Sequence, residues 1–472
     1  MAPNRKKNAL NRRSFIKSTG CAALGYTTLF SSLINMKAIA SAALDKSEGD
    51  ESGDYKAMVC ILLGGGADSH NMLIPRGNNE YNEYLTTRSN LAIPKSQLLS
   101  LNHAPVDGKQ FGVHPDMPQT RDLFNSGKLA WLSNVGTLVE PMTKAQYESN
   151  TAGKPLGLFS HSDQIKHWQT GRPGDRSTLG WGGRVADLIQ SQNSNPNLSM
   201  NISLSGNNFF QNGENTVEYS IRPTGEFGIN GYGEQNNYNL RRDAAINSIL
   251  DREYADIFEE TYINTFKKSV DTSEEMSEAL SQVQDFNTDF SDNMVSDQLK
   301  MIAKVIAARE SLGFNRQTFF VHFGGWDHHD EILESQQEKL PILDSALGEF
   351  MSVLEELGLE NQVTTFTVSD FGRTLTSNGD GSDHAWGGNA MVMGGAVNGG
   401  QIFGDAPSLE LGSDLMLPRG VLIPTTSASE YFAELAAWFG VNQSDLFDIF
   451  PDLSNFYSPG NSYPIGFMDP NA

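Results

Sequence analysis

The stretch "FFVHFGGWDHHDE", residues 319–331, places two adjacent histidines between carboxylates directly after an apolar run. An apolar run that ends in two glycines is typical of a buried strand that enters a tight loop. The side chains of Asp327 and His329 would therefore lie at the end of a strand. Imidazole together with carboxylate suits Zn²⁺, Mn²⁺ or iron. The pattern indicates half of a metal site, in which His328 is a less favoured donor because adjacent side chains rarely reach one ion.

Other residues of the same chemical type lie close to other apolar runs. Asp68 follows "VCILLGGGA", Asp370 follows "TTFTVS", and His384 lies in "GDGSDHAWGG", just before another apolar run. In open α/β sheets, ligands bind beyond the carboxyl ends of the strands. Carboxylates gathered there would repel one another, and a divalent cation removes that conflict. A turn explains Asp68 better when it is taken alone. Together, these residues predict a site for a divalent metal ion, which is Zn²⁺, Mn²⁺, Mg²⁺ or Ca²⁺.

The segments that would position these residues alternate between two periodicities. Short apolar runs such as 57–63 and 318–323 indicate buried strands, and amphipathic stretches such as 296–313 and 339–358 indicate helices. This alternation predicts an α/β fold with a mostly parallel sheet and helices on both faces. Residues 205–300 differ, because an Asn- and Gly-rich stretch precedes a long helical pattern there. We expect an insertion of loops and helices in that range.

The N-terminal segment has the order of an export signal. Arg12 and Arg13 precede a weakly apolar stretch, which closes with the small residues "AIASA". We expect residues 1–40 to be a twin-arginine signal peptide, 41–55 a flexible acidic linker and 56–472 the folded domain. The chain would pass through the twin-arginine export machinery and be periplasmic or secreted, with no membrane span in the mature part. A chance basic amphipathic start is the alternative.

The overall charge excludes two classes of partner. The chain has 34 Lys and Arg residues against 57 Asp and Glu residues, a formal net charge of −23. Omitting the basic first 40 residues makes the charge still more negative. Such a protein is repelled by nucleic acids and by anionic membrane surfaces, so neither is expected as a partner.

Several of these motifs together resemble a known family. The N-terminal signal, "LLGGGADSHNMLIP", "SHSDQIKHWQTG", "GGWDHHD" and "SDFGRT" followed by "GSDHAWGGNAMVMGGAVNGGQIFGD" are similar to the DUF1501 proteins. Those proteins in turn resemble the alkaline phosphatase/sulfatase superfamily through the order Asp, nucleophile, Asp with His, Asp, His. The resemblance implies an alkaline-phosphatase-like core with divalent metal ions as cofactors.

The resemblance also implies roles for the individual metal-type residues. Asp68 would be the first metal carboxylate, and Asp327 with His329 would form one metal site that His384 completes. Asp370 would be the carboxylate of a second site. There this chain departs from the superfamily, because it has phenylalanine where alkaline phosphatases have the following histidine. The second site would then be weaker, have one ligand fewer or be absent.

The predicted catalytic residues are Ser160, His161 and Arg373. The superfamily has its nucleophile near a helix start, where N–H groups hold an anion, and Ser160 with His161 beside it fits that place best. A helix N-cap role for Ser160 is the competing explanation, and Ser69 is a second candidate nucleophile. Arg373 would pair with a phosphate or sulfate oxygen, unless it has a structural role.

These observations predict an exported metal-dependent hydrolase of phosphate or sulfate esters, with a small-molecule or polysaccharide ester as substrate. The alternative is a non-catalytic extracytoplasmic binding or scaffold protein that retains the fold and, at most, a structural metal. Phenylalanine in place of the expected histidine favours the alternative, and the metal-type residues at the strand ends favour the enzyme.

Overall fold

A computed structural model describes residues 55–225, 236–458, 460 and 463–470 of the chain. The predicted signal peptide, residues 1–40, and nearly all of the predicted linker, residues 41–55, lie outside the described residues. Among the residues described, no helix is both long enough and apolar enough to cross a membrane.

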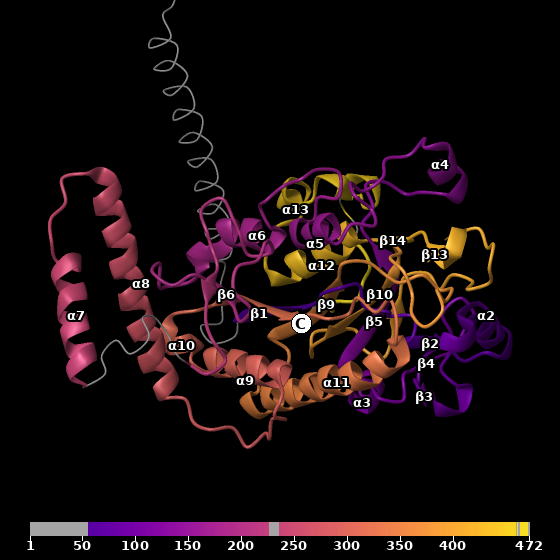
Figure 1. The fold of residues 1–472 in the computed structure, drawn as a ribbon, viewed down its shortest axis with the longest axis horizontal. Coiled ribbons are helices and arrows are strands. Elements are labelled where there is room, and N and C mark those ends of the chain that lie inside the picture. The colour runs from indigo at the N-terminus through magenta and orange to yellow at the C-terminus, as the bar shows by residue number, and fades with distance from the viewer. Residues whose placement is uncertain (1–54, 226–235, 459, 461–462, 471–472) are drawn as a thin grey trace, which may run out of the picture.

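A nine-stranded sheet forms the centre of the structure (Figure 1). Its hydrogen-bonded order is β11-β5-β10-β9-β1-β8-β6-β7, with β14 paired to β5. All pairings within it are parallel except those of β10 with β5 and with β9. The strands are β1 (Lys56–Leu63), β5 (Leu129–Gly136), β6 (Asn201–Ser203), β7 (Tyr219–Ser220), β8 (Arg316–Phe323), β9 (Val363–Ser369), β10 (Gly388–Met393), β11 (Ile402–Phe403) and β14 (Thr426–Ser427).

Helices cover both faces of this sheet. In Figure 1, α3, α9 and α11 lie on one side of it, and α5, α6, α12 and α13 lie on the other. Their bounds are α3 (Pro118–Asn125), α9 (Met294–Ala307), α11 (Ile332–Leu357), α5 (His161–Thr170), α6 (Trp181–Ile189), α12 (Ala428–Phe439) and α13 (Gln443–Ile449). The predicted α/β fold with a mostly parallel sheet and helices on both faces is confirmed.

The α9 helix shows why these segments pack as they do. Val295, Leu299, Ile302 and Ile306 recur at helical spacing, and all four are fully buried. The central strands are buried on both faces, as their nearly continuous apolar sequences predict. The edge region of the sheet near residue 202 contains a shorter strand. β6 is short and fully buried, because it lies inside the sheet between β8 and β7.

The remaining elements lie around this core. Two small sheets contain β2 (Leu73–Pro75), β3 (Leu99–Ser100) and β4 (Phe111–Val113), and β12 (Met416–Leu417) with β13 (Val421–Leu422). The further helices are α2 (Asn78–Arg88), α4 (Lys144–Ser149), α7 (Asn237–Leu250), α8 (Ile257–Ser281) and α10 (Arg309–Leu312). Helices α7 and α8 extend away from the sheet in Figure 1, within the range where the sequence predicts an insertion.

The direction of β10 decides what gathers at one edge of the sheet. Because β1, β8 and β9 are parallel, their carboxyl ends meet at the same edge. β10 runs antiparallel to β9, so its amino end reaches that edge instead. The loop before β10 therefore lies among the loops that follow β1, β8 and β9.

Candidate metal centre

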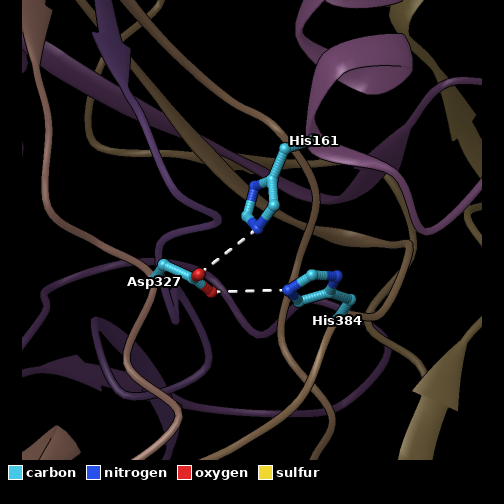
Figure 2. A group of neighbouring side chains, drawn as sticks. All are labelled: His161, Asp327 and His384. Atoms are coloured by element: carbon cyan, nitrogen blue, oxygen red, sulfur yellow. Dashed lines mark ion pairs between the residues drawn. The ribbon is translucent and has the colours of Figure 1, made fainter.

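Three side chains from three different segments converge at this edge. His161 begins α5, Asp327 follows β8, and His384 precedes β10. One ligand atom from each lies within 4.8 Å of the others. Asp327 Oδ2 is 3.4 Å from His161 Nε2, and Asp327 Oδ1 is 3.4 Å from His384 Nε2 (Figure 2). The two imidazoles thus point at the two oxygens of one carboxylate.

A third imidazole joins this group. His329 Nε2 lies 3.1 Å from Asp327 Oδ1 and 3.0 Å from His384 Nε2. We call His161, His329 and His384 together with Asp327 the histidine centre. Its members come from two loops and a helix, so only the folded sheet brings them together.

The tautomer of each histidine follows from its second ring nitrogen. His161 Nδ1 lies 2.6 Å from Asp370 Oδ2, His329 Nδ1 lies 3.2 Å from Asp383 Oδ1, and His384 Nδ1 lies 2.9 Å from the carbonyl oxygen of Phe159. Carboxylate and carbonyl oxygens only accept, so each Nδ1 carries the proton and donates it. In neutral imidazoles, all three Nε2 atoms then present a lone pair toward Asp327.

This arrangement fits a bound cation. The Nε2 atoms of His329 and His384 lie only 3.0 Å apart. Their lone pairs repel each other unless a proton or a metal ion lies between them. His161 Nε2 is buried and makes no hydrogen bond within the described part of the chain. An oxygen acceptor behind each ligating imidazole is the usual arrangement that orients a metal-binding histidine. The donor set of imidazoles and one carboxylate therefore fits Zn²⁺, Mn²⁺ or iron better than Mg²⁺ or Ca²⁺, which prefer oxygen.

The charges around the centre favour a carboxylate and a neutral imidazole. Partial burial acts to raise the pKa of Asp327, but the Arg373 guanidinium, His329 and His161 outweigh it and hold the pKa below the ordinary value. Burial, reinforced by repulsion from His161 and Arg373, lowers the pKa of His384. At neutral pH, Asp327 is then ionised and His384 is neutral, which are the forms that bind metals.

Asp370 supports the centre from behind. Its side chain is buried, with Oδ2 on His161 and Oδ1 accepting the Gly65 N–H at 3.0 Å. Both oxygens are therefore engaged within the protein. The sequence predicts Asp370 as a metal ligand, but in the structure it orients a ligand-type histidine. The ring of Phe371, where the superfamily pattern has histidine, packs 4.8 Å from the ring of His161.

Arg373 also supports the centre. It is 1% exposed, and it makes a close ion pair with Asp327. Its other donors go to the carbonyl oxygens of Gly65, Gly66, Ser382 and Trp326. This geometry gives Arg373 the role of holding three loops and Asp327 together. The predicted contact with a substrate oxygen would require it to give up these partners.

Asp68 is placed apart from the histidine centre. Its carboxylate forms a close ion pair with Arg88 of α2, and both side chains are fully buried. Arg88 also donates to the carbonyl oxygen of Thr374 at 3.1 Å. The sequence predicts a metal ion as the partner of Asp68, but in this structure the partner is the guanidinium of Arg88. Asp68 is therefore not among the converging ligands.

The two candidate nucleophiles differ in their surroundings. Ser160 is the N-cap residue of α5, but its side chain does not cap the helix and lies 3.1 Å from Ser162 Oγ. It thus borders the histidine centre through its neighbour His161. Ser69 is buried, and its Oγ accepts the Asn389 N–H at 2.7 Å, which gives it a structural role.

Sequence reasoning missed two features of the centre. It associated His161 with the nucleophile, whereas the structure points His161 Nε2 at Asp327. It also gave no role to Asp383, although Asp383 holds His329 and pairs closely with Arg419. Arg419 has a left-handed backbone, with φ of 66°. The one available signal for Asp383 was its position directly before His384.

Solved structures offer distant similarities. They include the PsFucS1 sulfatase from Pseudoalteromonas sp., at 11% identity, covering 87% of this chain and 72% of that one, with a TM-score of 0.35. A protein of the alkaline phosphatase superfamily from Vibrio parahaemolyticus is 12% identical, with 91% and 79% covered and a TM-score of 0.36. The lipoteichoic acid synthase LtaP from Listeria monocytogenes is 9% identical, with 82% and 80% covered and a TM-score of 0.31.

Sequence comparison gives a clearer result. No curated protein matches the chain. The model of the family described as "Protein of unknown function (DUF1501)" matches residues 55–418, which include β1, the loops of the histidine centre and the sheet strands up to β11. The family that the motifs indicate is thereby confirmed: this chain belongs to the DUF1501 family.

Proposed function

We propose that this protein is an exported, metal-dependent hydrolase of phosphate or sulfate esters. The observation that carries the proposal is the histidine centre, in which three Nε2 atoms with fixed tautomers face one ionised carboxylate. Three protein ligands around a metal ion with an open coordination position are typical of catalytic rather than structural sites. A divalent ion held by His161, Asp327 and His384, with His329 beside them, would supply Lewis-acid chemistry to an ester oxygen.

The start of α5 supports an anionic ester as the substrate. His161 is the first residue of this helix, so the N–H groups of the first turn lie next to the centre. Such N–H groups and the helix dipole favour a phosphate or sulfate group. Ser160 precedes them and is the nucleophile of the proposal, with a water molecule as the other candidate.

Metal content and hydrolysis, measured together, test the proposal. Purified protein, incubated with Zn²⁺ or Mn²⁺ and desalted, should retain about one metal equivalent per chain by elemental mass spectrometry. It should also hydrolyse members of a panel of phosphate and sulfate esters. The double variant His161→Ala/His384→Ala should lose both properties. His103→Ala, in the loop between β3 and β4, is the matched control and should keep both.

The outcomes separate the parts of the proposal. Absence of metal in the parent protein, or equal hydrolysis by the parent and the double variant, contradicts it. If Ser160→Ala hydrolyses as fast as the parent, the attacking group is water and not Ser160.

Export is tested separately. If residues 1–40 direct the twin-arginine pathway, replacing Arg12 and Arg13 by lysine should retain the protein in the cytoplasm, as cell fractionation would show. Unchanged export of that variant contradicts this part of the proposal.

A specific observation favours the second candidate, a metal-containing binding or scaffold protein without catalysis. Asp68, which the superfamily resemblance assigns to a metal site, pairs with Arg88. Arg373, predicted to contact an anion, is engaged by Asp327 and by backbone carbonyls. Retention of metal together with no hydrolysis of any ester would support this candidate.

A further inference from the structure

A cleft with a volume of about 450 Å³ lies one turn along α5 from His161. It is bounded by α5, by the carboxyl ends of β1 and β8, and by the loop after β6. Ile165 of α5 lines it and follows His161 by four residues, so the two side chains lie on the same face of one helix. One face of α5 therefore leads from the centre into the cleft.

The loop after β1 also connects the cleft with the histidine centre. His322, at the end of β8, lines the cleft, and its ring lies where a side chain at Gly64 would have to go. The next residue, Gly65, donates its N–H to Asp370 behind the histidine centre. A ligand in the cleft would thus lie within one short loop of the centre.

The wall of the cleft is fixed by internal hydrogen bonds. Gln169 Oε1 accepts the N–H groups of Phe209 and Phe210, at 2.8 and 3.0 Å. Asn208 accepts the N–H of Gln211 at 2.9 Å. These buried or half-buried amides shape the loop after β6, so the cleft is formed before any ligand arrives.

Other polar groups in the cleft have no such partner. Asn207, Glu218 and the His322 ring all line it, and within the described residues none of these side chains makes a hydrogen bond or an ion pair. Apolar surface lies between them, contributed by the half-buried side chains of Ile165 and Phe209. Donors and acceptors around an apolar floor are typical of small-ligand sites of about 300–1,000 Å³.

The charges select the class of ligand. The carboxylate of Glu218 repels an anionic group, while amide, imidazole and carboxylate side chains all exchange hydrogen bonds with hydroxyl groups. The half-buried side chain of Ile165 suits the C–H face of a sugar ring, and the Phe209 ring, over which the Lys166 ammonium lies at 5.1 Å, adds apolar surface at its edge. We propose that this cleft binds neutral sugar residues of a glycan whose phosphate or sulfate ester reaches the histidine centre. The identity of that ester rests on the proposed function, whereas sugar binding in the cleft does not.

Binding of neutral oligosaccharides tests the inference without any catalysis. The probes are neutral oligosaccharides of glucose, galactose, mannose or N-acetylglucosamine, measured by isothermal titration calorimetry and by saturation-transfer NMR on the full mature chain. At least one should bind, and Asn207→Trp and Glu218→Ala should each weaken that binding by about tenfold or more. Asn197→Trp, an exposed position before β6, is the matched control and should bind as the parent does.

Further comparisons keep the test decisive. If each variant unfolds at the same temperature as the parent, a loss of binding is not caused by a loss of fold. Absence of binding by every oligosaccharide, or equal binding by the parent and Asn207→Trp, overturns the inference. If oligosaccharides still bind His161→Ala/His384→Ala while the parent hydrolyses no ester, the sugar-binding cleft is supported and the proposed hydrolase function is rejected.

Discussion

Two carboxylates at the same edge of the sheet have opposite surroundings. Asp327 lies among three imidazoles, with its side chain 44% exposed. Asp68 is fully buried against one guanidinium, that of Arg88. Both follow buried parallel strands and a run of glycines, so their local sequences are alike. The difference comes from the partners that tertiary structure delivers, α2 for Asp68, and α5 together with the loop before β10 for Asp327.

This comparison shows how an acidic residue at a strand end becomes structural or functional. Arg88, a permanent cation from the same chain, pairs with one oxygen of Asp68, and both side chains are fully buried away from solvent. Asp327 also pairs with an arginine, Arg373, but its side chain is partly exposed and its other oxygen faces His161 Nε2, so that oxygen remains available to a ligand. We therefore expect the two sites to respond differently to the same perturbations.

Metal removal should give the largest effect, and only at the histidine centre. A metal ion that binds only the folded protein stabilises it by about 4 kcal/mol at a thousandfold excess over Kd. Adding Zn²⁺ to chelator-treated protein should raise the free energy of unfolding in urea by that order. The stability of His161→Ala/His384→Ala should not change when Zn²⁺ is added. An equal gain of stability in both proteins would show that the ion does not bind at the histidine centre.

Removing the ion pair between Asp68 and Arg88 should destabilise the fold without loss of metal. Arg88→Leu leaves the Asp68 carboxylate buried and unpaired, at a cost of about 3–5 kcal/mol. Urea unfolding measures the loss, and the metal content of the remaining folded protein should equal that of the parent. The double variant Asp68→Asn/Arg88→Leu should regain part of the stability. A loss of metal in folded Arg88→Leu would show that the two sites are coupled.

Glu434 provides a third kind of carboxylate, one surrounded by backbone N–H groups. Burial raises its pKa to about 7, although it accepts the N–H groups of Ile465, Gly466 and Met468, which favour the charged form. The folded state therefore prefers the protonated group. Its contribution to stability is fully present below about pH 4.5 and decreases by about 3 kcal/mol as the pH rises to about 7.

The test of this pH dependence is a difference between two proteins. Urea unfolding of the parent and of Glu434→Gln, measured across pH 4.5 to 7 in small steps, should show the parent losing stability relative to the variant as the pH rises. Parallel curves for the two proteins would contradict the raised pKa.

The smallest of these effects should come from Asp370→Asn. Asparagine can still accept the Gly65 N–H, but it no longer stabilises the Nδ1–H of His161 as a carboxylate does. Loss of such an outer partner typically weakens metal affinity by about 10- to 100-fold. Competition with a chromophoric chelator measures the affinity. An affinity equal to that of the parent would mean that the tautomer of His161 is fixed by other contacts.

Much of the fold could be predicted from the sequence, because buried strands and amphipathic helices have distinct periodicities. β1, β8, β9 and α9 lie where their patterns indicate. The direction of β10 could not be predicted, because a strand buried on both faces has the same apolar sequence in a parallel or an antiparallel pairing. Likewise, α11 begins at Ile332, before the expected residue 339, and contains Pro341.

The candidate site was predictable in its residue types but not in its pairings. Asp327, His329 and His384 were identified from their positions next to strands, and the structure brings them together. Nothing in "NNEYNEYLTTR" shows that its final arginine is buried, so the partner of Asp68 could not be foreseen. His161 was harder still, since its contact with Asp370 joins residues 209 positions apart.

The hydrogen bond from Gly65 to Asp370 makes this amide a built-in spectroscopic probe. The two oxygens of Asp370 connect the Gly65 N–H to His161, so electron density drawn from the imidazole changes the charge that this amide proton senses. Its chemical shift should therefore move when an ion is bound, although Gly65 is not itself a ligand. The backbone amide resonance of Gly65 would then report occupancy of the histidine centre by an ion in real time, without a label on any metal-binding side chain.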